Sequence, residues 1–290
     1  MKKFFYLLLA SVFAFAFTSC SDDEDDVPSS TVAALAGSYE SVMDYSLVEM
    51  PGEPSKNHVT VNIQSAGGNK VNIQLPAFGA GMMSIPAVVI NEVEVAKENG
   101  VYTFSKKVDG TVEVNGAQKT YTVDLTGKIS ADRQTFELVE KMKYGNMPFT
   151  LLMQYQPYSV AGMVAGNYAA DMNVSLLEMP DNGVLISTQP TLKVEAIGAD
   201  QVKVTLPEIV YEEMKMTIPG IVIDNAKVAE DGDNYKVTAD YKGKADEKDV
   251  ECKLEGSKNA DGSFKYTATI KYGKMPMHLV AAFTPQTEKK

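Results

Sequence analysis

The chain has 290 residues, of which 44% are hydrophobic, and its formal net charge is −11 at pH 7. This length is enough for two ordinary domains or one large domain. The acidic balance argues against a nucleic-acid-binding protein, because binding to a phosphate backbone needs a basic surface.

The N-terminus predicts a secretory signal peptide over residues 1–19. Two lysines precede an almost wholly apolar run at 4–17, which is shorter than the roughly 18–20 residues of a bilayer-spanning helix. The small residues before Cys20 resemble a lipobox, the signal for bacterial lipoprotein processing. This resemblance implies that Cys20 becomes the mature N-terminus and anchors the protein to a membrane through a lipid. The alternative is an ordinary signal peptide with an incidental cysteine.

A dense acidic segment follows the cysteine. It consists of Ser21 and then Asp22, Asp23, Glu24, Asp25 and Asp26. Charges of one sign this close together repel one another and keep the chain extended, so we expect residues 20–34 to form a disordered tether. The segment also resembles the export signal of Bacteroidota-type lipoproteins, which implies a lipid-anchored protein of the outer membrane, exposed at the cell surface.

The rest of the chain is an internal duplication. Five short motifs occur twice, in the same order. They are Gly37-Ser38-Tyr39 and Gly166-Asn167-Tyr168, SLVEMP at 46–51 and SLLEMP at 175–180, VNIQLP at 71–76 and VKVTLP at 202–207, IPAVVIN at 85–91 and IPGIVID at 218–224, and KYGNMP at 143–148 and KYGKMP at 271–276. We therefore predict two similar domains at 35–156 and 164–286, with a linker at 157–163 and a tail at 287–290.

Within each copy, apolar and polar residues alternate with the period of two that is typical of strands. Turn pairs such as Asn99-Gly100 and Asp231-Gly232 separate the alternating runs and favour tight hairpins. The predicted fold class is all-β, with about eight antiparallel strands per copy in a barrel or sandwich.

The last strand of each copy gives a specific prediction of burial. Its alternation places eight residues on the inward face: Phe149, Leu151, Met153, Tyr155, Met277, Leu279, Ala281 and Phe283. Outward residues of the same strands are also apolar (Leu152, Val280 and Ala282), which suggests that the two domains contact each other there.

A short apolar turn, a Gly-x-Tyr motif and a series of hairpins together resemble the calycin (lipocalin-like) superfamily. The closing Tyr-Gly-x-Met-Pro strand is similar to the calycin-like domain of Bacteroidota surface lipoproteins, present here twice. Lipocalins carry tryptophan where this chain has Tyr39 and Tyr168, and they place an arginine on a late strand that is missing near 149–155 and 277–283. The resemblance implies two barrels, each either filled by side chains or holding one small ligand.

The sequence carries no recognisable catalytic or metal-binding motif. His58 and His278 stand at unrelated positions of the two copies, and HExxH, HxH, CxxC and GxSxG do not occur. We therefore predict no enzyme, no metal site and no cofactor. Glu49 and Glu178 recur at matching positions, and we interpret them as polar residues at strand ends rather than as catalytic groups. Cys252 shares a face with Val250 and Leu254, which predicts a small buried hydrophobic residue.

The two copies diverge in one region, between the Leu-Pro and Ile-Pro motifs. Loops carry function on a constant scaffold, so this region is the candidate for ligand or partner contact; the alternative is a hydrophobic plug over one barrel end. The candidate residues are Phe78, Met82, Met83, Ile209, Tyr211, Met214 and Met216.

Three functional hypotheses remain open. The first is a non-catalytic surface lipoprotein whose barrels bind a small apolar molecule or a partner protein. The second is a glycan-binding accessory lipoprotein, which the 14 tyrosines favour and the missing tryptophan disfavours. The third is a hydrolase that uses an unrecognised pair of carboxylates.

Overall fold

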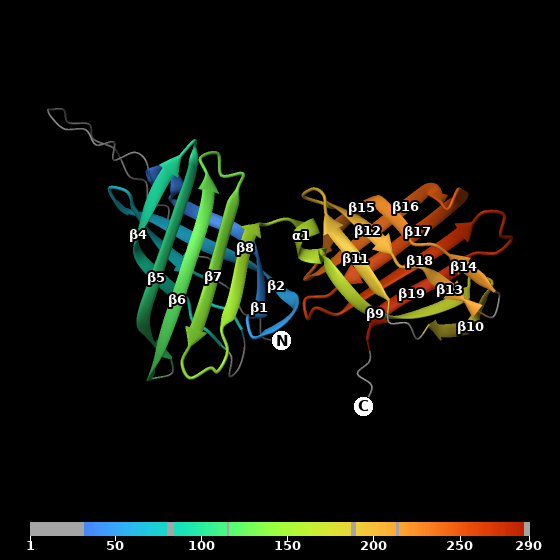
Figure 1. Cartoon of the computed structure of the whole chain (residues 1–290), viewed down its shortest axis with the longest axis horizontal. Coiled ribbons are helices and arrows are strands. Elements are labelled where there is room, and N and C mark those ends of the chain that lie inside the picture. The colour runs from blue at the N-terminus through green and yellow to red at the C-terminus, as the bar shows by residue number, and fades with distance from the viewer. Residues whose placement is uncertain (1–31, 80–83, 115, 187–189, 213–214, 287–290) are drawn as a thin grey trace, which may run out of the picture.

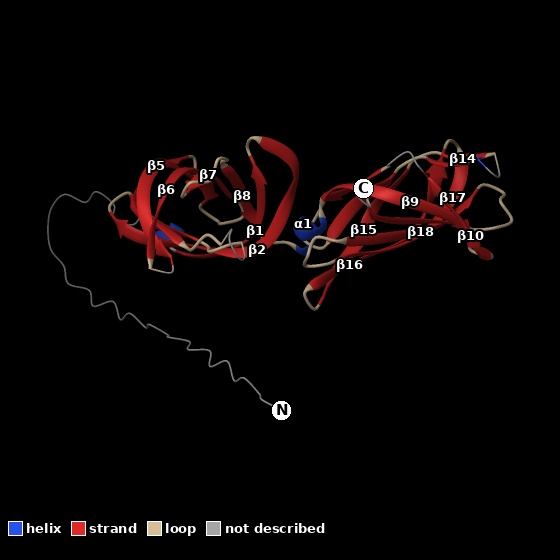
Figure 2. Cartoon of the chain, turned by 90° about the horizontal axis from the view of Figure 1, so that it is seen from below, coloured by secondary structure: helices blue, strands red, loops and turns tan. Residues whose placement is uncertain are grey.

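The computed structural model describes residues 32–286 except for 80–83, 115, 187–189 and 213–214. These residues form two antiparallel barrels that lie side by side along the long axis, with the short helix α1 (Val160–Val164) between them (Figures 1 and 2). The predicted all-β fold with two tandem barrels is confirmed. The predicted signal peptide, Cys20 and the acidic residues 21–26 lie outside the described residues.

Barrel 1 is a closed meander in which each strand pairs with the next and the last strand returns to the first. A 3-10 helix, η1 (Ala33–Leu35), precedes it, and Val32 is already buried in its core, although Val32, Ala33 and Ala34 fall within the expected tether. The strands are β1 (Gly37–Leu47), β2 (Met50–Gly67), β3 (Lys70–Leu75), β4 (Val88–Glu98), β5 (Val101–Val114), β6 (Ala117–Ser130), β7 (Phe136–Tyr144) and β8 (Leu151–Pro157).

Barrel 2 repeats this meander after α1, with two additions. Strand β9 pairs with β10 and β11 on one side and with β19 on the other, so the barrel closes. The strands β10 and β11 together take the place that β2 has in barrel 1. A short hairpin, β13–β14, forms its own sheet. The strands are β9 (Gly166–Leu176), β10 (Met179–Ile186), β11 (Thr191–Ala196), β12 (Gln201–Leu206), β13 (Ile209–Tyr211), β14 (Met216–Ile218), β15 (Ile221–Asp231), β16 (Asn234–Ala245), β17 (Lys248–Lys258), β18 (Phe264–Tyr272) and β19 (Leu279–Pro285).

The barrel interiors contain large apolar side chains, as the alternation predicts. Six of the eight residues expected inside the last strands are buried, whereas Phe149 and Met277 are half-buried. Cys252 is buried as predicted, and burial raises the pKa of its thiol to about 12. The largest buried side chains include Tyr102, Phe136 and Tyr155 in barrel 1. Both barrels therefore have cores built from their own side chains.

An aromatic ring and a cation close one end of each barrel. The Arg133 guanidinium lies 5.7 Å from the Tyr39 ring centre and donates to the carbonyls of Ala34 (2.8 Å) and Ala36 (2.7 Å). A Cβ on Gly37 would come within 3.0 Å of this guanidinium, so a larger residue at this position would crowd the arginine. The cation that the sequence lacks on its last strands thus comes from the β6–β7 turn.

In barrel 2, Lys258 at the end of β17 takes the place of the arginine. Its ammonium lies 5.7 Å from the Tyr168 ring centre and donates to the Met163 carbonyl at 2.8 Å. Tyr168 itself donates to the carbonyl of Val164. The end of α1 is thereby fixed to the end of the barrel, as η1 is in barrel 1.

The two barrels contact each other through unlike surfaces. Gly162 of α1 lies against Val42 on the outside of barrel 1, where a Cβ on the glycine would be 3.3 Å from the valine Cγ2. The His58 ring stacks on Tyr158 at 3.9 Å, and Tyr158 also donates to Glu230 of barrel 2. These contacts use β1, β2, the linker residue Tyr158, α1 and β15, rather than the outward residues of the last strands that the sequence suggested.

Candidate binding cleft between the barrels

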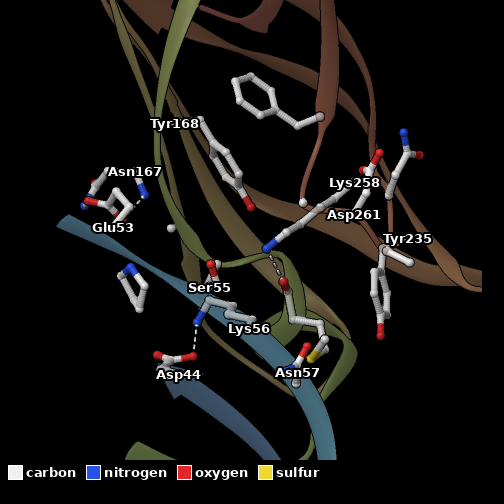
Figure 3. Close-up of a pocket in the computed structure, with 18 of the residues that line it drawn as sticks. Asp44, Glu53, Ser55, Lys56, Asn57, Asn167, Tyr168, Tyr235, Lys258 and Asp261 are labelled. Carbon is white, nitrogen blue, oxygen red and sulfur yellow. Dashed lines mark hydrogen bonds and ion pairs between the residues drawn. The ribbon is translucent and has the colours of Figure 1, made fainter. Parts of the chain in front are cut away.

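A cleft of about 640 Å³ lies between the two barrels. Barrel 1 contributes β1 and residues 53–57 of β2, whereas barrel 2 contributes the end of α1, the start of β9 and the β17–β18 turn. Figure 3 shows that polar side chains from both barrels gather around it. The cleft therefore exists only because two copies of one fold are held next to each other.

The barrel 1 wall contains an ion pair. Asp44 on β1 and Lys56 on β2 are direct cross-strand partners, and the lysine Nζ lies 2.7 Å from the aspartate Oδ1. Only 11% of the lysine side chain and 21% of the aspartate side chain are exposed. A pair this shielded from water interacts more strongly than a fully exposed pair, so it gives this wall a fixed arrangement of charges.

The barrel 2 wall contains Lys258, whose ammonium closes the barrel end on one side and faces the cleft on the other (Figure 3). Burial, and to a smaller extent repulsion by Lys56, lower the pKa of this group to about 8, while the Asp44 carboxylate acts in the opposite direction. The charged form is thus costly here, because the ammonium has lost water without gaining a counter-ion.

A hydrogen bond links the two walls at the rim of the cleft. The Glu53 carboxylate accepts from the backbone N–H of Asn167 at 3.2 Å and from its side-chain Nδ2 at 3.1 Å. On the opposite side, Asp261 accepts from the N–H of Ser263 at 2.8 Å within the β17–β18 turn. The carboxylates of the cleft are therefore held in place by neutral or cationic donors of the protein.

Comparison with known proteins places both barrels in one family. The model of the calycin-like β-barrel domain matches residues 35–156 and again 164–285. The chain belongs to the calycin-like β-barrel domain family. A crystal structure of a Bacteroides fragilis protein, described as a "putative outer membrane protein", is also similar, with 17% sequence identity and a TM-score of 0.52. The match covers 88% of this chain and 99% of that one, and at this identity it shows the fold alone. No curated protein sequence matches the chain.

None of the predicted contact residues that the structure describes lines the cleft of this calycin-like protein. Phe78 bridges to Ile85 and packs against the core of barrel 1, whereas Ile209, Tyr211 and Met216 pack in barrel 2. Met82, Met83 and Met214 lie outside the described residues. Ile209 and Tyr211 are buried, whereas Phe78 and Met216 are half-buried.

The two recurring glutamates connect strand ends in both calycin-like barrels. Glu49 accepts from the N–H of Thr150 at 2.8 Å, and this bond is the main cause that lowers the pKa of its carboxyl. Glu178 accepts from the N–H of His278 at 3.4 Å and lies 3.3 Å from the ring Nδ1 of the same histidine. Both carboxylates thus tie the first hairpin of a barrel to its last strand, which agrees with the strand-end interpretation.

Calycin-like barrel 1 also contains a buried carboxyl group that sequence reasoning missed. Glu140 is 1% exposed; one oxygen accepts from the Tyr155 hydroxyl at 2.7 Å, and the other has no hydrogen-bond partner in the described structure. Burial raises the pKa of this carboxyl to about 7. By register, Ala268 and Phe283 occupy the equivalent places in barrel 2. The signal was available, because Glu140 lies in phase with the inward residues Leu138 and Met142.

Within the described residues, no group of three or more His, Cys, Asp or Glu side chains is placed to hold a metal ion. None of the helices in that part of the chain has the length and apolar character that a membrane span requires.

Proposed function

We propose that this protein is a non-catalytic lipoprotein of the outer membrane that binds a small hydrophilic ligand, such as a saccharide, in the cleft between its barrels. The observation that carries the proposal is the cleft itself. Its volume of about 640 Å³ falls within the roughly 300–1,000 Å³ of typical ligand sites. Hydroxyl, amide and charged groups from both barrels converge on it.

The barrel interiors support a hydrophilic ligand in the cleft over an apolar ligand inside a barrel. Tyr102, Phe136 and Tyr155 are fully buried in barrel 1, and Tyr266 and Phe283 in barrel 2. An apolar molecule would have to displace such side chains from a packed core, which costs several kcal/mol for each large residue.

The carboxylates of the cleft support a binding role rather than hydrolysis. A glycoside hydrolase needs one carboxyl group that can donate a proton and a second that can attack or activate water. Asp44 is paired with Lys56, Glu53 accepts from Asn167, and Asp261 accepts from its own turn. The hydrogen bonds from Ser263 lower the pKa of the Asp261 carboxyl, which disfavours a role as the acid, and the other two carboxylates are already engaged by donors of the protein.

The membrane location rests on the N-terminal sequence. The lipobox-like residues before Cys20 and the acidic segment 21–26 support a lipid anchor and display at the cell surface, and the Bacteroides fragilis protein of the same fold is described as a "putative outer membrane protein". Replacing Asp22, Asp23, Glu24, Asp25 and Asp26 with alanine tests this. We expect a lipidated protein that protease added to intact cells no longer reaches, and equal digestion of both forms would reject surface routing.

Binding in the cleft is tested by blocking it. Ala260 lines the cleft at an exposed turn, and Ala131 is its counterpart in the β6–β7 turn of barrel 1, outside the cleft. Ala260→Trp should abolish binding of saccharides in a calorimetric screen that also includes fatty acids, whereas Ala131→Trp should leave binding intact. Tight binding of a fatty acid that both variants retain would contradict the proposal.

A second candidate function is contact with a partner protein. The first hairpin of each barrel exposes a matching apolar pair at its tip, Val48 and Met50 in barrel 1 and Leu177 and Met179 in barrel 2. Substituting Met50 and Leu177 with lysine should reduce cross-linking to other proteins on intact cells. The exposed Val222, changed to lysine, provides the control.

A further inference from the structure

Lys258 differs from Lys56, the other cation of the cleft, because no ion pair engages it among the described residues. Among the described residues, no carboxylate lies within ion-pair distance of its ammonium, whose one hydrogen bond goes to the neutral carbonyl of Met163. An ammonium carries three donors. Two N–H groups of a half-buried cation are therefore left for the Tyr168 ring and the cleft.

Comparison with barrel 1 shows that closing the barrel end does not require this arrangement. Arg133 has the same structural role and directs its donors to two carbonyls, those of Ala34 and Ala36. Barrel 2 instead has a compact ammonium at a place where the second barrel opens onto the cleft. Lys56, from the opposite wall, lies close enough for its charge to act on Lys258.

We propose that the ligand of the cleft carries an anionic group, a carboxylate, sulfate or phosphate ester, which binds to Lys258 with support from Lys56. This inference rests on the proposed function and names the chemical class of its ligand as an acidic saccharide. The anion supplies the counter-ion that Lys258 lacks and accepts its remaining N–H groups in charge-assisted hydrogen bonds. The hydroxyl groups of the saccharide bind to the neutral polar side chains around it.

The negative charges of the cleft are arranged so that they do not compete with such a ligand for Lys258. The Asp44 carboxylate is occupied by Lys56 at 2.7 Å. Glu53 is directed to Asn167, and Asp261 to the N–H of Ser263. Each carboxylate already has a donor from the protein, which leaves Lys258 as the cation that is free to take an anion.

Inorganic sulfate provides a direct test, because it probes Lys258 without knowledge of the natural ligand. The ¹³Cε signals of labelled protein are followed against pH in sodium sulfate and in sodium chloride of equal ionic strength. Sulfate should raise the pKa of Lys258 from its starting value of about 8, because a bound anion favours the charged form. The Lys248 signal, from an ammonium 4.8 Å from the Tyr272 ring centre and outside the cleft, reports the non-specific effect of salt. If Lys258 responds no differently from Lys248, the inference is wrong.

Variants test the class of ligand, and one of them is expected to bind more tightly, a result that loss of folding cannot produce. Asp44→Asn frees Lys56 and should strengthen binding of digalacturonate, a galactose 6-sulfate and a galactose 6-phosphate, while neutral digalactose is unaffected. Lys258→Met should weaken binding of the acidic probes by about 10- to 100-fold, the contribution of a charge-assisted hydrogen bond. Arg133→Met removes the equivalent cation of barrel 1 and should leave binding unchanged.

The outcomes separate this inference from the proposed function. Sulfate that acts on Lys258 while no saccharide binds would support the anion site and reject the saccharide ligand. A second outcome is that Ala260→Trp abolishes saccharide binding, but acidic and neutral saccharides bind equally well to the unmodified cleft. This result would support the proposed function and overturn the anion site. The three acidic probes also distinguish which anionic group fits.

Discussion

Replacing Glu140 with glutamine should remove a pH-dependent loss of stability from barrel 1. The carboxyl is buried, and its pKa is raised from 4.5 to about 7. The folded barrel therefore keeps a proton that the unfolded chain has already lost at pH 5 or 6. Because the folded state binds more protons in this window, the free energy of unfolding is highest below pH 4.5, falls as the pH rises toward 7 and then levels off.

The magnitude follows from the difference between the two pKa values. Each pKa unit corresponds to about 1.4 kcal/mol, so a rise of about 2.5 units corresponds to roughly 3 kcal/mol. Glutamine has a similar size, still accepts a hydrogen bond from Tyr155 and does not ionise. Any constant effect of the substitution cancels when two pH values are compared. The free energy of unfolding of Glu140→Gln, taken relative to that of the wild type, should therefore rise by about 3 kcal/mol from pH 4 to pH 8.

Urea unfolding followed by circular dichroism at a series of pH values measures this change. Glu137→Gln is the matched control, because Glu137 lies on the same strand with its side chain 58% exposed, and it should show no such gain. Tyr155→Phe should move the titration of Glu140 to higher pH, since the tyrosine hydroxyl bond lowers the pKa of that carboxyl. A difference between Glu140→Gln and wild type that is the same at pH 4 and pH 8 would refute the reasoning.

Three further predictions concern single residues. Arg133→Met should lower the free energy of unfolding by about 1–3 kcal/mol, because the carbonyls of Ala34 and Ala36 lose a charged donor; thermal unfolding of the variant measures this, and an unchanged midpoint would exclude a role in closing the barrel. Cys252 should resist alkylation by iodoacetamide at pH 8 until urea unfolds barrel 2, since its thiol has a pKa of about 12; mass spectrometry detects the adduct, and rapid labelling of the folded protein would contradict its burial. Cys20→Ala should abolish incorporation of labelled fatty acid and release the protein from the membrane fraction, and continued membrane association would reject the lipid anchor.

The barrels were predictable because their determinants are local and occur twice. Alternation identifies the inward residues Leu151 and Leu279, and the repeated motifs separate the domains. The closing cations were missed because Arg133 and Lys258 stand at hairpin ends, where charged side chains are usually solvated. Their roles depend on contacts with chain segments about 95 or more residues away. The cleft was missed for a similar reason, since it depends on how two finished barrels meet.

The way in which the barrels meet also limits how many can join. Barrel 2 presents the α1 end and barrel 1 presents the outside of β1, so the contact is of the head-to-tail kind that can in principle continue into an open-ended fibre. A third unit, or another molecule, would need to dock Gly162 on the β9 position that matches Val42. That position is Asp171, so a charged residue stands on barrel 2 where barrel 1 presents the apolar Val42. Barrel 2 therefore does not repeat the apolar surface that receives Gly162 on barrel 1, and this difference between the two copies disfavours continuation of the series beyond two.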